Sequence, residues 1–207
     1  LAFQILNADY KNWESCMSAD ACDVTQRTLT KVRPGHADLT GLIKFGQTDA
    51  RNILERASAR ETAVRVAAGS VAKQYLSALG VQVGGYVKSV CGIEDDCEYK
   101  FSDLAAAKSS PLFMLSKEKE EAAMRLIDKL KEKGDTAGGV VEIRVHGLKS
   151  GFGGCMTYGE KLDGRLAGAL MGVQAIKGVE VGMGFKAAAL PGSKVHGELY
   201  RNNGVDT

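Results

Sequence analysis

Residues 59–79 read ARETAVRVAAGSVAKQYLSAL, and this stretch predicts one helix, with helical apolar spacing over four turns. Its apolar residues recur at i, i+3, i+4 and i+7, which is the spacing of one face of an α-helix. Gly80 follows the last of them and suits the end of a helix. The apolar face is expected to pack against a core and comprises Val64, Ala67, Ala68, Val71, Ala72, Tyr75, Leu76 and Leu79.

Strands and helices are expected to alternate on both sides of this helix. Further helices are predicted over residues 116–133 and 162–173, where apolar residues recur every three or four positions. Strands are predicted over residues 1–10, 81–90, 140–145 and 195–200, and a polar loop over residues 9–30. This order indicates an α/β or α+β fold, and because no linker interrupts it, we expect one domain over residues 1–207.

The start of the long helix has the composition of an anion site. Ser58 is a good N-cap, and Glu61 three residues later fits a capping box. Free amides, a positive helix end and the guanidinium groups of Arg56 and Arg60 together favour phosphate. Arg60 lies four residues before the apolar Val64, so we expect its base near the buried side. The carboxylates of Asp38 and Glu61 are equally good partners for it.

A second candidate site lies in the turn Arg33-Pro34-Gly35-His36-Ala37-Asp38. A Pro-Gly turn suits a proton donor that must point away from the scaffold, and imidazole titrates near neutral pH. From these residues alone, His36 and Arg33 could equally be ordinary turn residues.

Composition excludes several classes of protein. The net charge is +2, which gives no nucleic-acid signal, and positive residues gather around residues 27–65, which favours a small anionic ligand. No segment approaches the ~20 apolar residues of a membrane span, and no secretory signal is evident. The five cysteines are predicted to be reduced thiols, because their number is odd and no export signal is evident. The five-residue gaps in Cys16/Cys22 and Cys91/Cys97 do not match the usual spacing of zinc ligands. No metal is expected.

The two arginine-rich motifs together resemble those of the chorismate synthase family. The turn at residues 33–38, the block Arg56-Ala57-Ser58-Ala59-Arg60-Glu61-Thr62 and the following Arg65-Val66-Ala67-Ala68-Gly69 carry the resemblance. Further similar blocks are Gly134-Asp135-Thr136-Ala137-Gly138-Gly139-Val140-Val141-Glu142, Lys161-Leu162-Asp163 and residues 174–185, which read QAIKGVEVGMGF. The resemblance runs from about Leu6 to the end of the chain. It implies a β-α-β sandwich with helices packed between sheets.

The resemblance also implies an activity and its cofactor. Chorismate synthases eliminate phosphate from 5-enolpyruvylshikimate 3-phosphate with reduced FMN, without net redox change. By carry-over, His36 is catalytic, Arg33 and Arg60 bind substrate, and Arg56, Ala57, Ser58, Gln174 and Ala175 bind the flavin. The resemblance further implies a cytoplasmic homotetramer and an association with NADP. Without the resemblance, the sequence of residues 174–175 is only a weak indication of a cofactor-binding position.

The chain departs from the family at both ends. It lacks the family's N-terminal Gly-Glu-Ser-His-Gly block, with a second catalytic histidine, and the C-terminal Asn-rich, Gly-rich and Lys-Pro segments. We therefore expect the middle of a longer enzyme, folded but inactive by itself and without bound FMN. The alternatives are a non-catalytic, oligomerising core and a phosphate-binding module unrelated to the family.

Overall fold

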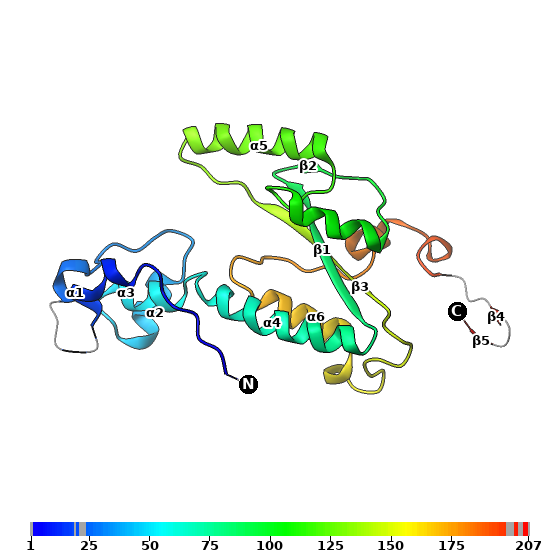
Figure 1. The fold of residues 1–207 in the computed structure, drawn as a ribbon, viewed down its shortest axis with the longest axis horizontal. Coiled ribbons are helices and arrows are strands. Elements are labelled where there is room, and N and C mark those ends of the chain that lie inside the picture. The colour runs from blue at the N-terminus through cyan, green and yellow to red at the C-terminus, as the bar shows by residue number, and fades with distance from the viewer. Residues whose placement is uncertain (1, 19, 21–23, 198–200, 203–204, 207) are drawn as a thin grey trace. The chain divides into compact units, whose positions relative to one another are not determined.

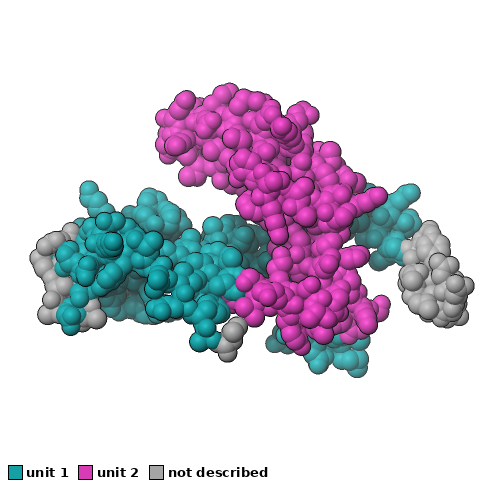
Figure 2. All heavy atoms as spheres, in the orientation of Figure 1, with its two compact units in different colours: residues 1–67, 153–207 teal, residues 68–152 magenta. Residues whose placement is uncertain are grey.

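The computed structural model describes residues 2–18, 20, 24–197, 201–202 and 205–206. Helices and strands both occur along the chain (Figure 1). Two compact units can be distinguished, the first formed by residues 1–67 with 153–207 and the second by residues 68–152 (Figure 2). Within the described residues, no helix is long and apolar enough to cross a membrane.

Unit 1 is mainly helical. Its N-terminal part holds α1 (Glu14–Met17), α2 (Asp38–Phe45) and α3 (Ala50–Arg56), with short 3-10 helices at Tyr10–Asn12 and Val24–Arg27. Its C-terminal part holds α6 (Leu162–Met171), the 3-10 helices Tyr158–Glu160, Gly184–Ala189 and Gly192–Lys194, and the strands β4 (Arg201–Asn202) and β5 (Val205–Asp206). The helix α4 (Glu61–Ala78) begins in unit 1 and continues into unit 2.

Local sequence explains the α2–α3 hairpin. Gly46 adopts φ 60°, the left-handed conformation that ends many helices, and it terminates α2. Asp49 then caps α3, because its Oδ1 accepts hydrogen bonds from the backbone N–H groups of Arg51 and Leu29, each at 2.9 Å. The Leu29 bond also ties the preceding segment to the start of α3. Neither helix was predicted from the sequence, because eight and seven residues are too few to establish a period.

Unit 2 is built on an antiparallel sheet of order β2-β1-β3. Its strands are β1 (Gln82–Val90), β2 (Ile93–Glu94) and β3 (Gly139–His146). Strand β1 pairs with β3 from Gln82↔His146 to Val90↔Gly139, with an irregularity between Val87 and Ser89. A 3-10 helix at Phe101–Ser109 and α5 (Lys117–Glu132) complete the unit. The predicted strands at 81–90 and 140–145 and the helix at 116–133 are therefore confirmed.

Two small apolar clusters hold unit 2 together. In the first, Tyr86 of β1 packs on Leu104 and Ala107 of the 3-10 helix. In the second, Val90 packs on Met114 and on Ala123 of α5. The clusters cover β1 from two elements and make it the most buried strand of the sheet, whereas most of β3 is exposed.

The long helix forms as predicted, but its apolar face is not buried. Helix α4 spans residues 61–78, yet none of its residues is buried by the part of the chain that the structure describes. Val64 is 53% exposed and Tyr75 is 68% exposed. The spacing of apolar residues identifies the helix face that other residues would cover, but it does not show which segment covers that face.

The predicted strand at residues 1–10 is wrong, and the predicted strand at residues 195–200 lies partly outside the described residues. Residues 2–9 contain no strand, because no described segment pairs with them. The predicted strand 195–200 falls on a turn at residues 195–196, and residues 198–200 lie outside the described residues. Between residues 9 and 30 the predicted loop contains one turn of α1 and two 3-10 helices.

Candidate functional site

His36 lies in an exposed turn whose geometry leaves one ring nitrogen open. Gly35 has φ 69°, a left-handed conformation that glycine adopts without strain. Nδ1 of His36 lies 2.9 Å from the carbonyl oxygen of Pro34, and because a carbonyl only accepts, Nδ1 must donate. The Nε2 atom therefore remains on the exposed side, as a proton acceptor in neutral imidazole and a donor in imidazolium.

Arg33 and Asp38 close this turn with a bidentate ion pair. Arg33 Nε lies 2.9 Å from Asp38 Oδ2, and Nη2 lies 3.0 Å from Oδ1. The backbone N–H of Arg33 also donates to Oδ2 at 3.0 Å. These hydrogen bonds, first those of the guanidinium, lower the pKa of Asp38 to about 2. Asp38 is fully buried while Arg33 is partly exposed, so the guanidinium retains Nη1 for another anion.

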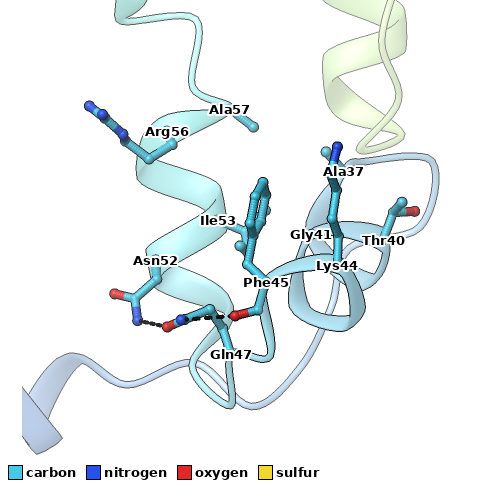
Figure 3. Close-up of a pocket in the computed structure, with 10 residues that line it drawn as sticks. All are labelled: Ala37, Thr40, Gly41, Lys44, Phe45, Gln47, Asn52, Ile53, Arg56 and Ala57. Carbon is cyan, nitrogen blue, oxygen red and sulfur yellow. Dashed lines mark hydrogen bonds between the residues drawn. The ribbon is translucent and has the colours of Figure 1, made fainter.

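Helices α2 and α3 line an open cavity of about 720 Å³ beside this turn. Figure 3 shows the Phe45 ring standing between the two helices, above the hydrogen-bonded pair Gln47 and Asn52. Lys44 and Arg56 bring the only two cationic side chains among the residues that line it. The full lining is Ala37, Thr40, Gly41, Lys44, Phe45, Gln47, Asn52, Ile53, Arg56 and Ala57. Mostly apolar walls suit a ligand that carries a ring.

Arg56 differs from the neighbouring arginines in having no carboxylate partner among the described residues. Arg51 and Arg60 both bind Glu55, at 3.2 and 3.0 Å. Arg65 binds Glu61 at 3.0 Å. In Figure 3, Arg56 extends from the last turn of α3 away from the other labelled side chains. Of these four arginines, Arg56 is therefore the one that can bind an anion without breaking an ion pair seen in the described residues.

The start of α4 differs from the prediction in two ways. The helix begins at Glu61, so Ser58 lies in a preceding turn, where its Oγ accepts the backbone N–H of Arg60 at 3.2 Å. Arg60 precedes the helix, and its side chain is 57% exposed and pairs with Glu55. The predictions that Arg60 lies near the buried side and pairs with Asp38 or Glu61 are wrong, because the turn at residues 57–60 takes it off the helix.

Gln174 is brought to the start of α4 although more than a hundred residues separate them in the chain. Its Nε2 donates a hydrogen bond to Oε2 of Glu61. Its Oε1 is buried and has no partner among the described residues. The next residue, Ala175, has φ 68°, which is rare for a residue with a side chain. Strain of this kind is concentrated at functional sites.

The structure therefore brings together some of the predicted site residues and separates others. Arg56 and Ala57 line the cavity and Gln174 lies against Glu61, whereas Arg33 and Arg60 do not line the cavity. The sequence did not single out Lys44 as a site residue, and Glu61 was expected only to cap the helix or to pair with Arg60. In Glu61 the hydrogen bond from Gln174, followed by the charge of Arg65, lowers the carboxyl pKa.

No metal centre is evident in the described part of the chain. Nowhere in it do three or more His, Cys, Asp or Glu side chains gather as a metal would require. Cys16, Cys91, Cys97 and Cys155 are free thiols, and Cys22 lies outside the described residues.

Comparison with known proteins defines the class to which this fold and site belong. A crystal structure of a chorismate synthase superposes with a TM-score of 0.77 at 44% identity, covering 81% of this chain and 53% of that one. The chorismate synthase of Desulforamulus reducens is 50% identical over 205 residues, covering 97% of this chain and 53% of the relative. That of Pelobacter propionicus is 50% identical over 206 residues, covering 98% and 52%. The predicted fold class is thereby confirmed.

The family model for chorismate synthase matches residues 1–206. The chain belongs to the chorismate synthase family. It spans about half the length of the curated relatives that it matches.

Proposed function

We propose that this chain is the central part of a chorismate synthase, a lyase of the shikimate pathway. In this proposal the whole enzyme converts 5-enolpyruvylshikimate 3-phosphate to chorismate and phosphate. The observation that carries it is about 50% identity to proteins of that name over nearly the whole chain. Because the chain covers only half of those relatives, the full-length protein is the form in which activity is expected.

The residues of unit 1 fit a flavin cofactor. Arg56 is available for a phosphate group, and Oε1 of Gln174 is an open acceptor for a ring N–H donor. Ser58 and Ala57 lie in the turn beside Arg56, and Ala175 follows Gln174. Bound reduced FMN supplies an electron-rich ring that assists loss of phosphate and hydrogen from the substrate and ends unchanged.

His36 is proposed to hold the proton that the reaction moves. The Pro34 carbonyl fixes its Nδ1–H, so the proton is delivered or taken at Nε2. Arg33 and Arg60 are proposed to bind the phosphate and carboxylates of the substrate through the N–H groups that their ion pairs leave over. Asp38 holds the Arg33 guanidinium in place.

The decisive experiment is chorismate formation by the full-length protein. Reduced FMN and 5-enolpyruvylshikimate 3-phosphate are supplied anaerobically, and chorismate absorbance and released phosphate are followed together. Equal amounts of both products are expected, and none with oxidised FMN. A full-length protein that binds reduced FMN and releases no chorismate would contradict the proposal.

The 207-residue chain alone is expected to be inactive, because the family's second catalytic histidine and further arginines are not among its residues. Chorismate formation by the isolated chain with reduced FMN would contradict this. From its family, we also propose that the whole enzyme is a cytoplasmic homotetramer that associates with NADP.

A further inference from the structure

Glu61 is held between two partners that use both of its oxygens. Oε1 accepts from Arg65, with Nε at 3.2 Å and Nη2 at 3.0 Å. Oε2 accepts from Nε2 of Gln174. Arg65 lies one turn along α4, so it fixes the Glu61 side chain against the helix that carries both. Arg65 thus holds the carboxylate through a contact that does not involve Gln174.

This arrangement determines the orientation of the Gln174 amide. An ionised carboxylate only accepts hydrogen bonds, so the NH₂ group must face Glu61 and the carbonyl oxygen must face away. A glutamate is ionised at neutral pH, and the hydrogen bond from Gln174 and the charge of Arg65 lower the pKa of Glu61 further. Oε1 of Gln174 is then left buried without a donor among the described residues. A buried acceptor without a donor is unfavourable until a ligand supplies one.

We propose that Glu61 is a positioning residue that orients Gln174 so that its Oε1 accepts a hydrogen bond from a ring N–H of the flavin. This inference rests on the proposed function, because it takes the flavin as the ligand. The isoalloxazine ring carries N3–H in both of its redox states, and this is the donor to which we assign the bond. The structure thereby gives Glu61 a role beyond the start of α4.

The test compares Glu61→Gln with wild type in the full-length protein. A glutamine at this position can either donate or accept, so it no longer selects one orientation of the Gln174 amide. The matched control is Glu118→Gln, the same substitution in the first turn of α5, where Glu118 is exposed. FMN and 3-methyl-FMN, which lacks the N3–H donor, are titrated by flavin fluorescence. The Gln174 side-chain amide signals are followed by NMR before flavin is added.

Wild type and Glu118→Gln are expected to prefer FMN over 3-methyl-FMN by about three- to tenfold, the scale of one net hydrogen bond. Glu61→Gln should reduce that preference to about twofold or less and shift the Gln174 amide signals. If Glu61→Gln fails to fold, Gln174→Leu should abolish the preference instead.

Three results would overturn the inference. The same preference in Glu61→Gln as in wild type would refute the role of Glu61 while leaving flavin binding intact. Tight FMN binding by wild type without any preference over 3-methyl-FMN would refute the acceptor role of Gln174. Absence of FMN binding by the full-length wild type would refute the proposed function as well.

Discussion

Gly41 in α2 is the position where one added methyl group tests the packing of the cavity most directly. Gly41 is buried against α3. A Cβ there would come within 3.0 Å of Cγ1 and Cδ1 of Ile53, and closer still to Cγ2. Ile53 is only 8% exposed, and its β-branched side chain is stiff at χ1, so its Cγ2 cannot easily move aside. The substitution Gly41→Ala is therefore expected to overpack the α2–α3 contact.

The magnitude follows from two opposing effects. Replacing a mid-helix glycine by alanine stabilises a helix by about 1 kcal/mol. Overpacking a filled contact costs about 1–3 kcal/mol. Gly41→Ala should therefore lower the free energy of unfolding by up to about 2 kcal/mol. Gly69 in α4 is the matched control, because no described atom lies within 4 Å of its Cβ position, and Gly69→Ala should raise stability by about 1 kcal/mol.

The assay is urea unfolding of the 207-residue chain, followed by circular dichroism. The substitution Ile53→Ala is made both in the wild-type chain and in the Gly41→Ala variant. Alone it should cost about 2–5 kcal/mol, and with Gly41→Ala it should cost about 1–3 kcal/mol less, because the overlap is removed. Stabilisation by Gly41→Ala as large as that by Gly69→Ala would show that the α2–α3 contact is not overpacked. An equal cost of Ile53→Ala with and without Gly41→Ala would show the same.

Three further predictions concern the site residues. His36→Ala in the full-length enzyme should lower turnover by about 10²-fold with unchanged thermal stability, since the ring is exposed; activity within about threefold of wild type would contradict its role. Ala175→Gly should stabilise the chain by about 0.5–1 kcal/mol, because the left-handed strain of about 1–2 kcal/mol exceeds the entropic cost of glycine; an unchanged urea midpoint would argue against strain. Because Arg33 lowers the pKa of Asp38 from 3.8 to about 2, their pair should contribute fully above pH 4 and be lost as the pH falls through 2; equal acid sensitivity of wild type and Asp38→Asn across that range would contradict this.

Elements with a long period or a strong alternation could be predicted from the sequence alone. Helices α4, α5 and α6 and strands β1 and β3 were expected at nearly their observed positions. Each depends mainly on local geometry, because side-chain period and end signals are properties of neighbouring residues. Short helices such as α2 and α3 could not be predicted, since two turns contain too few apolar residues to set a period.

In the candidate site, too, the local turn could be predicted from the sequence, whereas the ion-pair partners could not. The exposed turn that presents His36 follows from Pro34 and Gly35, whose backbone preferences act locally. The partner of each arginine could not be predicted in this way. Arg33 lies near Asp38 in the chain and Arg60 near Glu61, but only the observed turns decide that Arg33 binds Asp38 while Arg60 binds Glu55.

The sequence was sufficient to predict the family, the main helices and strands, and the turn that carries His36. Tertiary structure alone decided that Gln174 meets Glu61, that Arg56 is left without a carboxylate partner among the described residues, and that α2 and α3 form a cavity. The physical reason is that helix period and turn preference act over a few residues. Ion pairs, buried amides and cavities depend instead on contacts between segments that can be a hundred residues apart, which only the folded chain brings together.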